Sequence, residues 1–193
     1  TWTLTAHAMA QRLTNDDRVA FPYGVYDPAT YGCGVACDRF ASDGSFTVWE
    51  FQSDGEKRRA DALNLAAEGR VRVAGMDHRV TAGVLHSRQR ADFGPQVFDI
   101  AGLGNITGTA VLPRSAGVTD TNTNRDERST EFYARDAVDI TSTLRLWAGL
   151  RHTRLHRSSV RTDASQPTSY RQAFTTPWIA LGFEPRRGVL AYA

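Results

Sequence analysis

Long apolar runs and a large charge excess are both missing from this sequence. No apolar stretch approaches the roughly 20 residues that a membrane-spanning helix requires, and the mean hydropathy is negative. The formal net charge is only +2, and the arginines are spread among acidic residues instead of forming one basic face. Helical periodicity of any consequence is missing as well. These absences argue against a helical membrane protein and against a nucleic-acid-binding protein.

A convincing catalytic or metal-binding set is also missing. Of the five histidines, His152 and His156 would share one face of a strand. They would lie about 13 Å apart along an extended chain, which is too far for one metal ion. Ser158-Ser159 lacks the pattern of a nucleophile elbow. The sequence therefore predicts no enzyme, no resident metal and no cofactor, with a lipase-type or protease-type barrel as the alternative.

Cysteine is scarce. The two cysteines, Cys33 and Cys37, lie in a glycine-rich stretch. Such a pair fits a local disulfide in an oxidising, extracytoplasmic compartment. Two free thiols, or half of a metal site, are the alternatives.

The clearest positive signal is a period-two alternation between 127 and 156. From Leu144 to Arg151, leucine or alanine at even positions alternates with charged, aromatic or small residues at odd positions. In an earlier arm Phe132, Ala134 and Val138 share one face, and a short polar turn joins the two arms. The pattern predicts a β-hairpin with one apolar and one polar face.

Similar alternation recurs along the chain and gives about seven strands. Short turns alternate with long polar loops, which we place near 14–45, 91–126 and 156–168. Arginine at nearly every second inward position requires a wet interior, because a dry core cannot accept unpaired charges. The predicted fold is all-β: an antiparallel up-and-down meander that forms part of a large transmembrane β-barrel.

Four local features qualify this pattern. We expect a bulge or bend near Asp54-Gly55, and a bulge or a missing hydrogen bond at Pro177, because proline has no N–H to donate. Gly102-x-Gly104 is interpreted as a flexible turn. The run Lys57-Arg58-Arg59 indicates a solvated part of a strand, with a phosphate or lipid-headgroup contact as the alternative.

Several motifs stand in a characteristic order. Tyr-x-x-Asp (Tyr133 to Asp136) is followed by a short turn and by Leu-x-x-Gly-Leu-Arg (Leu146 to Arg151). Two further strand-like segments follow at 169–185 and 188–193, and motifs at 54–59 and 85–88 fit upstream. In this order the motifs resemble those of TonB-dependent outer-membrane receptors, in their ferric-siderophore branch. The resemblance covers nearly the whole chain.

That resemblance implies a receptor in the bacterial cell outer membrane that takes up ferric siderophores, with cobalamin or haem as alternative nutrients. It implies a barrel of about 22 strands, in contact with outer-membrane lipid, around a plug domain that this chain lacks. The TonB complex would supply energy through the plug. Residues 1–193 would then be a partial barrel domain. The chain starts and stops inside alternating segments, which also indicates a piece of a longer chain.

Aromatic loop residues are the candidate ligand contacts in such a receptor. The resemblance places Tyr23, Tyr26, Tyr31 and Phe98 in extracellular loops, where they would touch an iron chelate. Packing of the aromatics within their own loop is the alternative.

A protein of another class is the second hypothesis: a small self-contained barrel or a soluble β-sandwich with a binding or structural role. An odd number of strands argues against a closed bacterial barrel. Unpaired edges at both ends would also promote aggregation.

Overall fold

The computed structural model describes residues 1–25, 40–111, 117, 119–186 and 188–193. These residues form no helix, and their strands all belong to one antiparallel sheet. The expected all-β fold is confirmed. The strands are β1 (Trp2–Tyr23), β2 (Ser45–Val73), β3 (Met76–Asp92), β4 (Gln96–Asn105), β5 (Ala110–Val111), β6 (Thr123–Asp139), β7 (Leu144–Arg161), β8 (Thr168–Arg186) and β9 (Val189–Tyr192).

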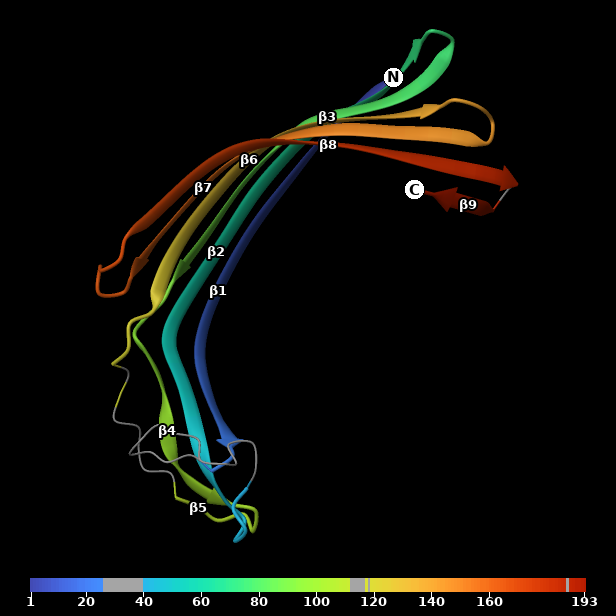
Figure 1. Ribbon diagram of the computed structural model, residues 1–193. Coiled ribbons are helices and arrows are strands. Elements are labelled where there is room, and N and C mark those ends of the chain that lie inside the picture. The colour runs from blue at the N-terminus through green and yellow to red at the C-terminus, as the bar shows by residue number, and fades with distance from the viewer. Residues whose placement is uncertain (26–39, 112–116, 118, 187) are drawn as a thin grey trace.

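The long strands neighbour one another in chain order, β1-β2-β3-β6-β7-β8-β9, which confirms the up-and-down meander. Figure 1 shows a single, strongly curved layer. The β2–β3, β6–β7 and β8–β9 turns gather at one end of it, and the tips of β1, β2 and β4 extend at the other. We call these ends the turn end and the loop end.

The loop expected over 14–45 begins later than predicted. Strand β1 continues to Tyr23, and Asp17 to Tyr23 pair with the first residues of β2. This extension could not be predicted because polar residues there interrupt the alternation of apolar and polar positions that indicates a strand. Besides its backbone pairing with β2, Arg18 donates two side-chain hydrogen bonds to the Asp54 carboxylate, at 2.9 and 2.7 Å.

Part of the loop expected over 91–126 is strand. After a three-residue interruption at 93–95, β4 continues the line of β3 and pairs with the loop-end half of β2. Gly102 and Gly104 lie inside β4 and form no flexible turn. An ideal Cβ at Gly104 would lie 2.5 Å from the Phe46 ring on β2, so glycine gives this ring its space.

The third loop, expected over 156–168, is shorter than predicted. Residues from His156 to Arg161 extend β7 and pair with Thr123 to Arg128 of β6. Only 162–167 separate β7 from β8. The serines and arginines of this stretch read as a loop because neither face is apolar there.

Of the two expected irregularities, the bulge near Asp54-Gly55 is present, and at Pro177 a hydrogen bond is missing without a bulge. Asn15 pairs with Glu56 but Asp17 pairs with Ser53, so β2 carries one extra residue at Asp54-Gly55, as predicted. Gly55 has a φ of 74°, in the left-handed region typical of a bulge glycine.

Pro177 lies in β8 without a bulge against β7, where the register is continuous from Leu144 to Ser159. The Leu181 N–H points to the β9 side, since it donates to the Ala193 carbonyl at 3.0 Å. Backbone groups alternate along a strand, so Pro177 also directs its nitrogen away from β7. The missing N–H donor of Pro177 therefore removes no hydrogen bond between β7 and β8.

The register gives the sheet two chemically different faces. The row Leu4, Ala67, Ala82, Ala134, Leu150 and Pro177 crosses six strands on one side. We call this side the apolar face and the opposite side the polar face. Leu4 and Ile179 on the apolar face are 82% and 72% exposed, so no protein layer covers them.

A hydrophobic core is almost absent from the described residues. The buried apolar side chains there are Val48, Val97 and Val138. The sheet is not closed on itself, and no second layer packs against it within the described ranges. It therefore lacks both features that the alternative hypothesis needs, the second sheet of a sandwich and the closure of a small barrel.

Candidate ligand-binding surface

Polar contacts between neighbouring strands organise the polar face. Arg151 on β7 pairs with Glu131 on β6 at 3.1 Å. The Tyr133 hydroxyl donates to the Asn64 side-chain oxygen on β2 at 3.0 Å, across Gly83 of β3. These contacts place charged groups at fixed positions along the face.

Toward the loop end, the polar face contains a groove of about 670 Å³. Arg157 and Glu127 form one wall, where the Arg157 Nε donates to the Glu127 carboxylate at 2.6 Å. The groove crosses the sheet from β1 to β7 and is lined among others by Gln11, Leu13, Arg58, Gln89, Phe93, Arg125, Glu127 and Arg157.

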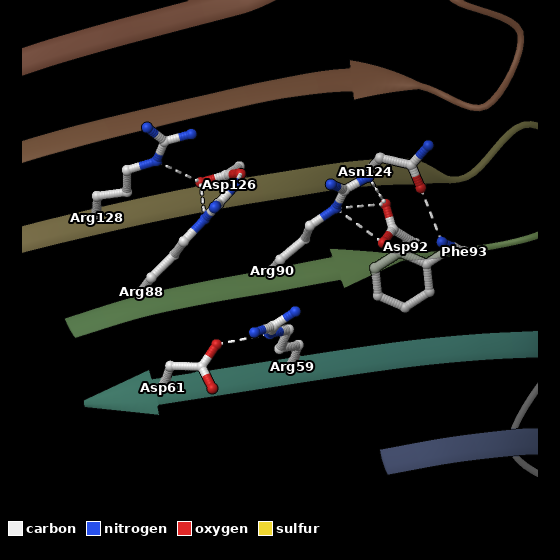
Figure 2. A network of polar contacts seen from close by, with 9 residues as sticks. All are labelled: Arg59, Asp61, Arg88, Arg90, Asp92, Phe93, Asn124, Asp126 and Arg128. Carbon is white, nitrogen blue, oxygen red and sulfur yellow. Dashed lines mark hydrogen bonds and ion pairs between the residues drawn. The ribbon is translucent and has the colours of Figure 1, made fainter. Parts of the chain in front are cut away.

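Arg58 is held in the groove by a carboxylate and by an aromatic ring. Its guanidinium donates to the carboxylate of the buried Glu56 at 3.1 Å, and lies 5.6 Å from the centre of the Phe93 ring. The Phe93 N–H in turn donates to the Asn124 side-chain oxygen at 2.7 Å (Figure 2). Arg125 has no acidic partner among the described residues, so the groove carries uncompensated positive charge.

An aromatic cluster follows the groove along the same face. Trp49 lies at its centre, with ring centroids 5.1 Å from Phe98 and 6.2 Å from Tyr23, and Phe98 lies 6.2 Å from Phe21. Odd-numbered residues of β1 stay on the polar face up to Tyr23, because the extra bulge residue belongs to β2. The cluster therefore continues the surface that Gln11 and Leu13 begin.

The two predicted ligand contacts that the structure describes are brought together in this cluster. Tyr23 and Phe98, on β1 and β4, are 47% and 52% exposed and both contact Trp49. Tyr26 and Tyr31, and the predicted Cys33 to Cys37 disulfide, lie outside the described residues.

Sequence reasoning missed Trp49, Phe93 and Arg125. The alternation of Trp49 with Val48 and Glu50 indicates that its side chain lies on the opposite face of the strand from theirs. Its contact with Phe98, however, depends on the register between β2 and β4. The combination of aromatic rings and arginines suits a planar or anionic ligand, which rings contact by stacking and guanidinium groups by charge and hydrogen bonds.

Other kinds of site are not found within the described ranges. No group of three His, Cys, Asp or Glu side chains there is arranged to hold a metal ion. No helix of these residues is long and apolar enough to cross a membrane.

Comparisons with known proteins give matches in structure alone. No protein-family model matches the sequence, and no curated protein does. A chain in the structure of the FpvAI–pyocin S2 complex matches 100% of this chain over 23% of its own length, with 12% identity and a TM-score of 0.69. The match to BauA, the ferric preacinetobactin receptor from Acinetobacter baumannii, covers 98% of this chain and 27% of the BauA chain. The sequence identity is 14% and the TM-score is 0.65.

The chain thus spans about a quarter of the length of these solved chains. Both are TonB-dependent receptors. The chain has the fold of a segment of such a receptor's β-barrel. In this segment the sheet is not closed.

Proposed function

We propose that residues 1–193 form part of the barrel wall of a TonB-dependent receptor in the bacterial outer membrane, and that this receptor takes up ferric siderophores. The observation that carries the proposal is one uncovered sheet with a continuous apolar face and, behind it, a polar face with an arginine-rich groove and an aromatic cluster. A lipid-facing wall around a wet lumen requires this division.

The apolar face is the side that contacts lipid in this proposal. Its middle rows contain aliphatic and aromatic side chains on six strands, and Leu4 and Ile179 are largely exposed. Exposure of this much apolar surface to water is unfavourable, whereas in a bilayer the same surface is in its preferred environment.

The polar face is the lumen side. Its arginines Arg70, Arg79 and Arg135 have no ion-pair partner among the described residues, and each is exposed. They are available to carboxylates and carbonyl groups of a plug domain outside these residues. Engagement of the TonB complex is assigned to that plug, so this segment contributes binding and passage of the ligand and no bond-making chemistry.

The ligand surface combines the groove and the aromatic cluster. Ferric siderophores are compact chelates, and many carry anionic or aromatic groups. Arg58 and Arg125 supply positive charge, and the Trp49, Phe98 and Tyr23 rings supply flat apolar contacts. The BauA neighbour is a ferric preacinetobactin receptor, which supports this ligand class for the chain.

The proposal is tested by membrane fractionation and by binding of ferric siderophores to the purified protein. We expect the protein in the outer-membrane fraction, and one member of a ferric-siderophore panel to bind it. A Trp49→Ala, Phe98→Ala double variant should weaken that binding by roughly tenfold or more, because each buried stacking contact contributes about 1 kcal/mol.

Phe174→Ala is the matched control, since Phe174 is an exposed aromatic on the polar face of β8, outside the cluster. Its affinity should equal that of the wild type. Recovery of the protein in a soluble fraction, or binding of no ferric chelate, would overturn the proposal.

A further inference from the structure

The apolar face carries a belt of basic residues at its loop end. Each of the six long strands β1, β2, β3, β6, β7 and β8 changes along this face from small or apolar residues to charged ones. On β3, for example, Val80, Ala82 and Val84 are followed by His86, Arg88 and Arg90. We call the charged positions the basic belt: Arg12, Lys57, Arg59, Asp61, His86, Arg88, Arg90, Asp92, Asp126, Arg128, Arg154, His156 and Arg171.

The charge of the belt is strongly one-sided. It contains seven arginines and one lysine against three aspartates, before any histidine is protonated. The turn end of the same face has no such belt, because Val71, Val138, Leu146 and Leu181 lie there and His78 is paired with Asp136 at 2.6 Å. The apolar band is therefore bordered by cations at the loop end alone.

Aspartates fix the guanidinium groups in the first half of the belt, across β2, β3 and β6 (Figure 2). The Asp126 carboxylate accepts hydrogen bonds from Arg88 and, at 3.3 Å, from Arg128. Arg59 donates to Asp61 at 2.6 Å, and Arg90 donates to Asp92 at 2.9 Å. One carboxylate thus holds two arginines that lie on adjacent strands.

The second half of the belt, on β7 and β8, has positive charge without such partners. Arg128, Arg154, Arg171, His86 and His156 line a shallow hollow of about 470 Å³. Neither Arg154 nor Arg171 has an acidic partner among the described residues, and both are exposed. The hollow opens beside Thr130 and Ala173, at the border of the apolar band.

We propose that this hollow binds the phosphate groups of an anionic lipid in the leaflet on the loop side. The proposal rests on the proposed function, because it requires the apolar face to lie in a bilayer. Guanidinium groups bind phosphate bidentately, and cations at the edge of an apolar band meet lipid headgroups. The hollow accepts the headgroup while the acyl chains continue along the aliphatic rows.

The experiment titrates the detergent-purified full-length protein with lipid A, a bis-phosphorylated glycolipid, by native mass spectrometry. The triple variant Arg128→Gln, Arg154→Gln, Arg171→Gln should bind lipid A on the order of a hundredfold more weakly, at about fivefold per cation removed. The wild type should bind dephosphorylated lipid A as weakly as this variant does.

Two further variants keep the test decisive. Arg70→Gln, Arg79→Gln, Arg135→Gln removes the same charge from the polar face and should bind lipid A like the wild type. Arg128→Lys, Arg154→Lys, Arg171→Lys retains the charge and should lose no more than about tenfold, since only the bidentate geometry is removed. If the glutamine variant fails to fold, the comparison between this lysine variant and dephosphorylated lipid A decides.

Equal lipid A affinity in the glutamine variant and the wild type would overturn the proposal. Inorganic phosphate that binds as tightly as lipid A would also overturn it, because the occupant would then not be a lipid. Ferric-siderophore binding by the same preparations separates the two proposals: if it persists while lipid A binding fails, only the lipid site is wrong.

Discussion

The Arg18 guanidinium on β1 holds the Asp54 carboxylate of β2 through two hydrogen bonds, at the bulge that interrupts the pairing of these strands. The Asp16 carboxylate accepts a hydrogen bond from the Gly55 N–H at 2.7 Å beside it. On the other side, an ideal Cβ at Gly94 would lie 2.6 Å from the Asp54 carbonyl. The bulge is thus held by hydrogen bonds from β1 and lies close against the β3–β4 connection, and it sets the register of the aromatic cluster beyond it.

Substitution of Gly55 tests the bulge. A Cβ at this position would meet nothing within 4 Å, but the φ of 74° disfavours any branched side chain. Gly55→Val should lower the free energy of unfolding by about 1–2 kcal/mol, and Gly55→Asn by less, since asparagine tolerates this region. Urea unfolding of the protein in lipid vesicles measures both; equal losses would mean that the conformation is not the cause.

Gly83 gives space to an aromatic ring on the neighbouring strand. An ideal Cβ there would lie 2.5 Å from the Tyr133 ring and 2.6 Å from the Leu65 carbonyl. Gly83→Ala should therefore displace Tyr133 from Asn64 and destabilise the protein by about 1–3 kcal/mol. Ser87→Ala, on the same face of β3, is the control and should change stability little. An unchanged unfolding midpoint for Gly83→Ala would contradict this assignment.

Neighbouring cations on opposite faces provide a test of the groove. Arg58 lies in the groove and Lys57 lies on the apolar face. Arg58→Met should weaken ferric-siderophore binding on the order of tenfold, because a charged hydrogen-bond donor is lost, whereas Lys57→Met should leave the affinity unchanged. Arg58→Met also removes the partner of buried Glu56, so the Glu56→Gln, Arg58→Met double variant is measured as well. Equal effects of the two methionine variants would exclude a specific role for Arg58.

The turn before β2 should depend on pH. The Ser45 hydroxyl and N–H donate to Asp43 at 2.6 and 2.9 Å and hold the pKa of that carboxyl below its ordinary value. Because the folded-state pKa is lowered, the stabilisation is complete above the unfolded-state pKa and is lost as the pH falls through the folded value. The Ser45 amide chemical shift should follow this acidic transition, and Asp43→Asn should abolish it. A transition that survives in Asp43→Asn belongs to another group.

Cys33 and Cys37 are proposed to form a disulfide on the sequence pattern alone. Mass spectrometry after alkylation without reduction should then show both thiols blocked. Its contribution to stability should be modest, because the loop that it closes is short. Two alkylated cysteines would refute the disulfide.

The sequence predicted the fold where the two faces of a strand differ. Leu144 to Arg151 alternates fully, and the structure places its leucines and its arginines on opposite faces. The signal failed at Thr14 to Tyr23 and at Gln96 to Asn105, where polar and apolar residues occur on both faces. These segments are strands because they pair with β2. Pairing between segments that are distant in the chain produces no periodic pattern in the sequence, so it could not be predicted there.

Some residues of the candidate site could be predicted from the sequence, but the contacts between them could not. Tyr23 and Phe98 were identified as loop aromatics, but their meeting at Trp49 follows from the β1–β2 and β2–β4 registers. The period of two divides the run Lys57-Arg58-Arg59: Arg58 lies on the polar face in the groove, whereas Lys57 and Arg59 lie on the apolar face in the basic belt, and Arg59 also lines part of the groove. The charge of this run was visible in the sequence, whereas the division into two surfaces required the structure.

Pro177 leaves one rung missing on the side of β8 that faces away from β7. A strand that pairs with β8 at this level receives one backbone hydrogen bond fewer, so its carbonyl must be served by water or by a side chain. Within a bilayer this is a local weak point in the backbone pairing on that side of β8. The N–H of the adjoining strand can still donate to the Pro177 carbonyl, so the two strands remain paired there by one hydrogen bond in place of two, and this level is where they would separate most easily.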